Sequence, residues 1–99
     1  MWFITVFQKY IKTNTAPDIG ELRTIGYYPH KEMAIEDVLE NAIDMNEGMY
    51  KYAVIEFIPC GLYQPATEKI FFEWDDQSRH YLEVDSENFL DDFGNYAIG

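Results

Sequence analysis

The stretch Tyr50–Ile58, YKYAVIEFI, decides how this 99-residue chain folds. Aromatic and β-branched side chains dominate it, and such side chains favour the pleated, half-buried surface of a sheet. The turn-forming residues 59–61, PCG, follow directly and end the pattern. This stretch gives the clearest strand prediction in the chain, and the other elements are placed around it.

Two strands are predicted upstream. Trp2–Ile11 (WFITVFQKYI) is apolar on both faces, which is typical of a strand that is central or covered on two sides. Thr13–Gly20 is rich in turn residues and is expected to be a connection, and Glu21–Tyr28 predicts the second strand. Gly26 inside that strand indicates a bulge or the close approach of another backbone.

A long helix is predicted between the second strand and Tyr50. Apolar residues recur with the helical period from about Lys31 to Glu47. The start lacks a strong capping residue, because Pro29 and His30 are weak N-caps. Gly48 is a plausible residue to follow the end of the helix.

Downstream, Lys69–Trp74 and Arg79–Val84 flank a short polar loop and predict a β-hairpin. Glu87–Phe93 is expected to form one helical turn, and Asn95–Gly99 is apolar enough to dock on the body of the protein. The order ββαβββ predicts an α+β fold in a single domain over residues 1–99. Its mainly antiparallel sheet would be covered on one face by the long helix.

The charge of the chain is strongly negative and unevenly placed. Eighteen acids stand against seven bases, for a formal net charge of −11, whereas small soluble domains usually carry a net charge of magnitude about 2 to 8. Residues 1–30 carry a net charge of +1, residues 31–67 carry −5 and residues 68–92 carry −7. Direct binding to nucleic acid is disfavoured because it needs clustered Lys and Arg.

The composition also predicts the compartment. Cys60 is the single cysteine, so no intramolecular disulfide framework is expected. No basic segment followed by an apolar run opens the chain, and no stretch approaches 18 apolar residues. We therefore expect a cytoplasmic protein (in the host cytoplasm if it is phage-encoded) that makes no membrane contact.

Acidic residues recur at helical spacing along the predicted helix. They are Glu32, Glu36, Glu40, Asp44 and Glu47. Successive carboxylates lie about 6 Å apart along the axis and within about 120° of the circumference, similar to the spacing of phosphates along one DNA strand. Each like-charge pair costs about 0.2–0.5 kcal/mol, and no base lies between Glu32 and Tyr50 to compensate. Two interpretations stay open: a solvated acidic face, or a surface that meets a basic partner.

Tyrosines are the second candidate for partner binding. The chain holds eight, of which five form a group at Tyr27, Tyr28, Tyr50, Tyr52 and Tyr63. Tyrosine is enriched at protein interfaces, although several could also pack along the sheet with their hydroxyls at its edge. The predicted partner-binding set therefore joins the helix acids with Asp75 and Asp76 of the hairpin loop and with Tyr27 and Tyr28.

Patterns for catalysis or metal binding are missing from the sequence. His30 and His80 each lack a second ligand three or four positions away, and Cys60 is isolated. The chain contains no glycine-rich phosphate loop, G-x-S-x-G or H-E-x-x-H motif. We expect no cofactor, no metal and no enzymatic activity.

Five segments spread over nearly the whole chain carry a resemblance. They are WFITVF at 2–7, RTIGYY at 23–28, AIE at 34–36, YKYAVIE at 50–56 and NYAIG at 95–99. With these segments the chain resembles a group of small acidic proteins from Firmicute chromosomes and their prophages and mobile elements. The resemblance implies no catalytic residues. By analogy of class it implies an anti-CRISPR-like or other anti-defence inhibitor, several of which mimic DNA in their charge layout.

The leading hypothesis is a non-enzymatic inhibitor that binds a basic, nucleic-acid-binding surface of a host defence protein, such as a CRISPR effector or another nuclease. One alternative is an intracellular interaction or regulatory module without nucleic-acid mimicry. Another is a small-molecule-binding or sequestering protein with an aromatic pocket near Tyr27, Tyr28 and Tyr52.

Overall fold

The computed structural model describes residues 1–11, 18–20, 22–41, 50–59, 66–85 and 96, with only the backbone of 9–11 and 18–20. Its elements in chain order are β1 (Trp2–Phe7), β2 (Lys9–Ile11), β3 (Asp18–Gly20), β4 (Arg23–Tyr28), α1 (Lys31–Leu39), β5 (Tyr52–Phe57), β6 (Glu68–Asp75) and β7 (His80–Val84). The predicted α+β fold is confirmed.

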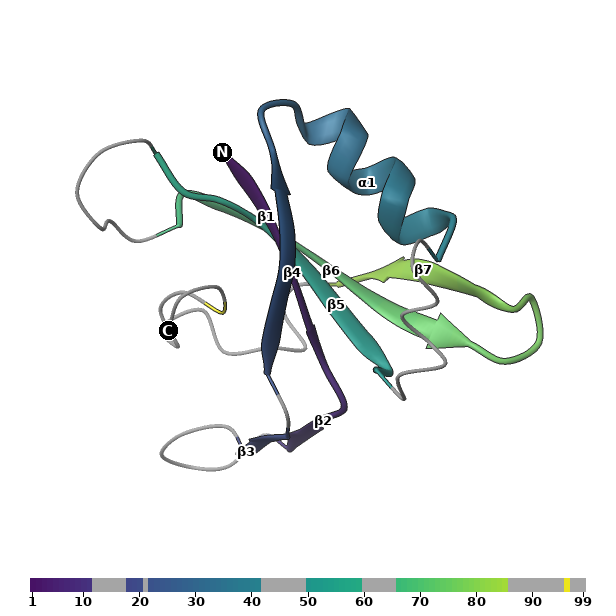
Figure 1. The fold of residues 1–99 in the computed structure, drawn as a ribbon. Helices are drawn as coiled ribbons and strands as arrows, with labels where there is room; N and C mark the ends of the chain where they lie inside the picture. Colours follow the sequence, from purple (N-terminus) through teal and green to yellow (C-terminus); the bar gives the residue numbers. More distant parts are fainter. Residues whose placement is uncertain (12–17, 21, 42–49, 60–65, 86–95, 97–99) are drawn as a thin grey trace.

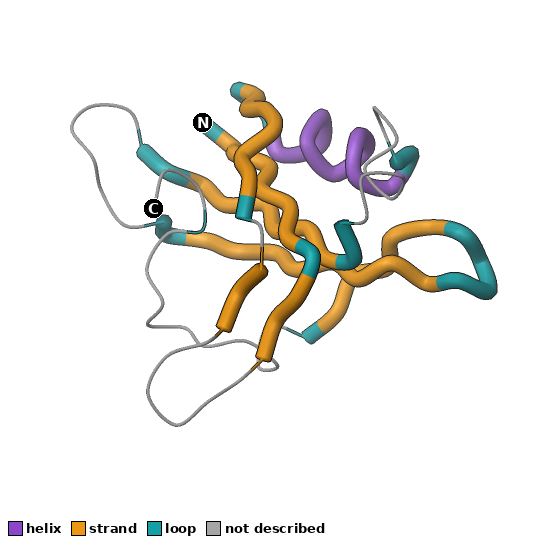
Figure 2. Tube along the Cα trace, turned by 60° about the horizontal axis from the view of Figure 1, so that its bottom comes forward, coloured by secondary structure: helices purple, strands orange, loops and turns teal. Residues whose placement is uncertain are grey.

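A five-stranded antiparallel sheet in the order β4-β1-β5-β6-β7 forms the body of the protein. α1 lies across one face of this sheet, as Figures 1 and 2 show. β1 and β5 pair with each other at the centre, so the two most apolar strands occupy the most buried positions. Their central position agrees with the apolar character of both faces of β1.

The first predicted strand, Trp2–Ile11, is too long. β1 ends at Phe7, opposite Tyr52 at the start of β5, so the sheet offers no partner for the residues beyond. After Gln8 the chain continues as β2, which pairs with β3 in a separate two-stranded ribbon. The expected connection Thr13–Gly20 therefore contains a short strand.

The bulge predicted at Gly26 is present in β4. Ile4 pairs with Gly26, whereas Thr5 pairs with Thr24, so Ile25 is the extra residue. The alternative reason for a glycine, a close approach of another backbone, does not apply. A Cβ atom added at Gly26 would meet nothing within 4 Å among the described residues.

The helix is shorter than the apolar period predicts. α1 begins after His30, which makes no side-chain cap, as expected, and it ends at Leu39 rather than at Glu47. Asn41 has a φ of 53° and donates its N–H to the Val38 carbonyl at 3.1 Å. A left-handed residue of this kind ends a helix, and asparagine tolerates the conformation. Gly48, predicted to follow the helix, lies outside the described residues.

Apolar side chains pack on both faces of the sheet. Under α1, Ala34 and Val38 meet Ile4, Ile55 and other buried residues of the strands. The opposite face carries a second, smaller cluster of buried side chains: Phe7, Val54, Phe71 and Tyr96. The burial of Tyr96 agrees with the docking expected for Asn95–Gly99, of which it is the described residue.

The predicted hairpin is confirmed as β6 and β7, joined by a turn at residues 76–79. Arg79 closes this turn with a φ of 58°. The helical turn expected at Glu87–Phe93 lies outside the described residues. Within the described part of the chain, no helix has the length and apolar character needed to span a membrane.

Candidate functional site

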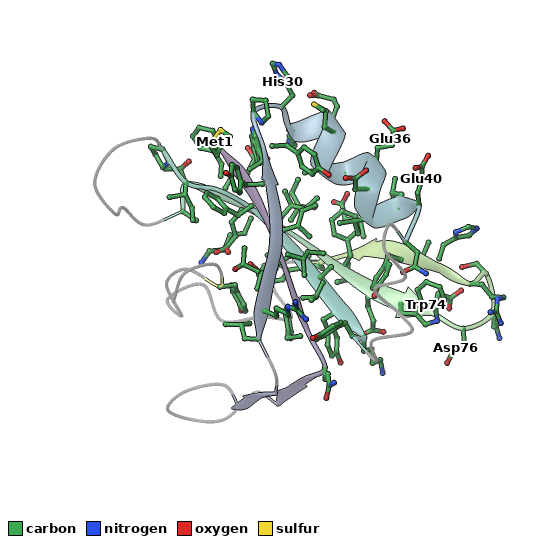
Figure 3. The ribbon with its side chains drawn as sticks, viewed as in Figure 1. Met1, His30, Glu36, Glu40, Trp74 and Asp76 are labelled. Carbon is green, nitrogen blue, oxygen red and sulfur yellow. The ribbon has the colours of Figure 1, made fainter. Side chains whose placement is uncertain are left out.

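The outer face of α1 presents carboxylates to solvent. Glu32, Glu36 and Glu40 are exposed, whereas Ala34 and Val38 on the other side of the helix are fully buried. Figure 3 shows Glu36 and Glu40 pointing away from the sheet. Three members of the predicted row therefore share one solvent-facing strip, about 12 Å long from Glu32 to Glu40. The other two, Asp44 and Glu47, lie outside the described residues.

The single base of α1 is paired mainly with an acid outside this row. Lys31 forms a 2.7 Å ion pair with Glu68 at the start of β6, and its ammonium group lies 5.5 Å from the Trp2 ring centroid. The hydrogen bond with Glu68 raises the pKa of Lys31 above its usual value, and nearby Glu32 and Glu83 add to the effect. Lys31 is thus held toward the sheet by Glu68.

A further acid of α1, Asp37, faces inward. The hydroxyl of Tyr28 in β4 donates a hydrogen bond to the Asp37 carboxylate. This contact joins the middle of the helix to the edge strand and thereby helps to set the rotation of α1. Asp37 is consequently a structural acid, separate from the exposed row.

Apolar side chains that the sequence analysis did not single out flank the row. Met33 and Leu39 are 45% and 43% exposed. At 100° per residue, Leu39 lies on one side of the three glutamates and Met33 on the other. The outer surface of α1 therefore combines an acidic centre with two apolar margins, which the spacing of the acids alone does not reveal.

The two acids of the hairpin, Asp75 and Asp76, accept hydrogen bonds from residues of the same hairpin. Asp75 accepts the Ser78 backbone N–H at 2.9 Å, and this bond holds the pKa of the Asp75 carboxyl below its usual value. Asp76 accepts the indole N–H of Trp74 at 3.0 Å, at the end of the hairpin in Figure 3. Because Arg79 and His80 lie in the same turn region, this tip is less uniformly acidic than the helix face.

The structure separates Tyr27 from Tyr28. Tyr28 packs on the helix side of the sheet, in the cluster with Trp2. Tyr27 points to the other face, with its ring centroid 5.5 Å from that of Phe3, and is 62% exposed. Tyr52 also lies on that other face, stacked on Phe7. The three tyrosines therefore do not line one aromatic pocket.

One carboxylate outside the predicted set, that of Glu56, is fully buried on the sheet face opposite α1. Its carboxylate accepts the backbone N–H of Tyr96 at 2.8 Å. Phe3 and Lys69 are its cross-strand neighbours in β1 and β6. The carboxylate thus acts as an internal anchor for a residue forty positions later in the chain.

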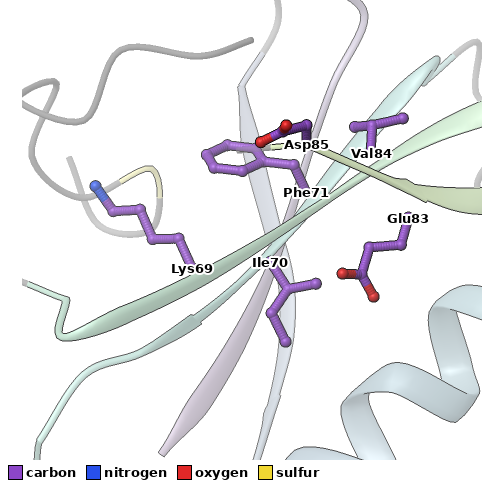
Figure 4. A pocket seen from close by; sticks show the side chains of 6 residues that line it. All are labelled: Lys69, Ile70, Phe71, Glu83, Val84 and Asp85. Carbon is purple, nitrogen blue, oxygen red and sulfur yellow. The ribbon is translucent and has the colours of Figure 1, made fainter. Parts of the chain in front are cut away.

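A shallow open pocket of about 420 Å³ lies where β7 ends beside β6. Its lining residues are Lys69, Ile70, Phe71, Glu83, Val84 and Asp85. Figure 4 shows that these side chains come from both faces of the two strands. The pocket is therefore an edge feature of the sheet, distinct from the helix face and from the tyrosines proposed for ligand binding.

Among the residues described, no group of three or more His, Cys, Asp or Glu side chains has an arrangement that could hold a metal ion. Comparison of the chain with protein-family models, with curated proteins and with solved structures gives no match.

Proposed function

We propose that this protein is a non-enzymatic inhibitor that binds a basic, nucleic-acid-binding surface of another protein through the outer face of α1. The chemistry fits a phage or mobile-element protein that acts on a host defence nuclease such as a CRISPR effector. The observation that carries the proposal is the exposed row Glu32, Glu36 and Glu40, whose nearest helix base, Lys31, is paired with Glu68.

The row is complementary in charge to the surface that it would meet. Its carboxylates repeat about every 6 Å along the axis, and sites that bind a nucleic-acid backbone neutralise its phosphates with Lys and Arg. The net charge of −11 would speed the approach to such a site. Because the interaction is between exposed charges, it should weaken as salt rises.

A second candidate follows from Met33 and Leu39 on the same surface. If these apolar margins provide most of the binding free energy, the protein is an interaction or regulatory module without nucleic-acid mimicry. Such a complex would be held by buried apolar area and would depend weakly on salt. The two candidates therefore differ in a measurable way.

The test measures DNA cleavage by a panel of purified, guide-loaded CRISPR effectors, and their affinity for this protein, at increasing NaCl concentration. We expect inhibition at low salt and an affinity that falls steadily with salt. E36K/E40K should weaken binding by about tenfold or more. The matched variant E73K/D85K has the same net charge but changes acids of the sheet outside the predicted binding set and leaves the helix row intact, so it should bind almost as well as the original protein.

Three results would count against the proposal. Equal losses in both variants would assign the effect to total charge instead of to α1. Binding that ignores salt and the E36K/E40K change, but is lost in M33S/L39S, would favour the interaction module. Lack of binding to every effector in low salt would reject this class of partner.

A further inference from the structure

The outer edge of β4 is open in the described part of the protein. β4 is the end strand of the sheet and pairs with β1 on its inner side only. In Figure 1 it lies in front of the other strands, and no described element covers its outer edge. Six residues of strand present a row of backbone groups about 20 Å long. Such an edge is a template for pairing with another strand.

Charge makes this edge the place where two copies of the chain can approach. Residues 22–30, LRTIGYYPH, contain no acid and one base, Arg23. Residues 1–30 carry a net charge of +1, whereas the remaining 69 residues carry −12. The other edge strand, β7, is shorter and contains Glu83. Two copies that each carry −11 repel least when they meet at β4.

Because of the bulge, the faces to which the side chains of β4 point follow the same order from either end of the strand. Thr24 and Tyr27 lie on the face opposite α1, where the Thr24 hydroxyl is 3.1 Å from that of Thr5 and Tyr27 lies beside Phe3. Ile25 and Tyr28 pack on the helix side. Arg23 and Gly26 pair with Val6 and Ile4 respectively, whose side chains belong to the helix-side cluster.

Directly opposed residues in an antiparallel pair must share a face. A register centred between Ile25 and Gly26 satisfies this rule for all three opposed pairs. It sets Arg23 against Tyr28, Thr24 against Tyr27 and Ile25 against Gly26. Without the extra residue Ile25, the same register would oppose side chains that point to different faces.

We propose that a second copy of this chain adds its β4 antiparallel to β4 of the first, across a twofold axis between Ile25 and Gly26. The two five-stranded sheets then form one continuous sheet, with both helices on the same face. Tyr27, which is 62% exposed in one copy, becomes covered. An interface of one strand per copy is small, so the dimer forms and dissociates with concentration.

Sedimentation equilibrium measures this dimer over protein concentrations up to about 1 mM. We expect the dissociation constant to fall at least about fivefold between about 0.05 and about 0.5 M NaCl, because salt screens the repulsion between the acidic bodies. This dependence is opposite in sign to that of the proposed partner binding. E36K/E40K reduces the repulsion without changing β4, so it should weaken partner binding but leave the dimer as tight as before or tighter. A failure of either proposal is therefore visible separately.

Y27E should abolish the dimer, because it places two like charges at the pairing edge. Tyr27 is mostly exposed, so the folded monomer should survive, and circular dichroism checks this. A monomeric mass for the unsubstituted chain at all concentrations and salt levels would overturn the proposal. A dimer that Y27E leaves unchanged would overturn it as well.

Cysteine cross-linking tests the register. In a C60S background, a mixture of the T24C and Y27C proteins should form a disulfide-linked heterodimer, because these positions oppose each other. Neither variant should cross-link by itself. L82C on β7 is the control, because Leu82 is 48% exposed but lies on the other edge strand. Cross-linking with L82C that equals the T24C–Y27C yield would overturn the β4 interface.

Discussion

The backbone N–H of Tyr96 donates a 2.8 Å hydrogen bond to the Glu56 carboxylate, which is fully buried in the central strand β5. The centroid of the Tyr96 ring lies 5.6 Å from that of the stacked Phe7 ring and 5.4 Å from that of Phe71, which it meets edge-on. The Lys69 ammonium group lies 5.5 Å from the centroid of the Tyr96 ring. One residue near the C-terminus thus covers the buried acid and completes the second apolar cluster.

Tyr96→Ala should lower the free energy of unfolding by about 3–4 kcal/mol, because it removes a buried aromatic ring and leaves a cavity against Phe7 and Phe71. Urea denaturation followed by circular dichroism measures the change. Tyr27→Ala is the matched control and should cost less than about 1 kcal/mol, since Tyr27 is mostly exposed. Equal losses in the two variants would contradict the role given to Tyr96.

The Tyr81 hydroxyl gives stability that depends on pH. It donates a 2.5 Å hydrogen bond to the Tyr50 carbonyl, and burial raises the pKa of Tyr81 to about 12 from 10.0. Below pH 10 the phenol is protonated in both states and its contribution is complete. Between pH 10 and about 12 the unfolded chain releases this proton first, so stability falls as pH rises.

Tyr81→Phe should therefore cost about 1–2 kcal/mol at neutral pH, because the Tyr50 carbonyl loses its partner. The difference between the variant and the unsubstituted protein should shrink as pH rises above 10. Urea unfolding across this pH range checks it, with Tyr27→Phe as the control. A constant difference at all pH values would contradict the assignment.

Arg79 closes the β6–β7 turn with a φ of 58°. Residues with a side chain pay about 1 kcal/mol or more in this left-handed region, whereas glycine does not. Arg79→Gly should accordingly raise the free energy of unfolding by about 0.5–1 kcal/mol. Gln77→Gly in the same turn should give no gain, and a stabilisation by both changes would indicate a general effect of the turn.

The Asp75 carboxyl should titrate below 3.8 in an NMR pH titration of the folded protein, because the Ser78 N–H and then the Ser78 hydroxyl stabilise its charged form. Ser78→Ala keeps the N–H and removes the hydroxyl, so it should move the pKa part of the way back. Because the folded state lowers this pKa, the contribution of Asp75 to stability is complete above pH 3.8 and is lost as pH falls through the lower folded pKa.

The main elements could be predicted because their side-chain patterns are local. The apolar run of β5 and the turn residues after it mark a central strand, and the chain order then gives the α+β class. The end of α1 could not be predicted in the same way. The apolar period continues past Leu39, and it is the left-handed backbone at Asn41 that ends the helix.

Only part of the candidate site could be predicted from the sequence. The period of two along a strand already places Tyr27 and Tyr28 on opposite faces, so this separation could have been foreseen. The burial of Glu56 could not have been foreseen, because Tyr96, which packs over it, comes from a distant part of the chain. The inward role of Asp37 likewise depends on a tyrosine in another element.

Asn41 also limits the helical part of the acidic row that the structure describes. Because α1 stops just before it, the described glutamates extend over about 12 Å of helix axis. One DNA strand advances by between three and four nucleotides over that length. The three described glutamates therefore have the reach of a trinucleotide, and a site that contacts a longer stretch of DNA would keep cationic groups beyond these three carboxylates.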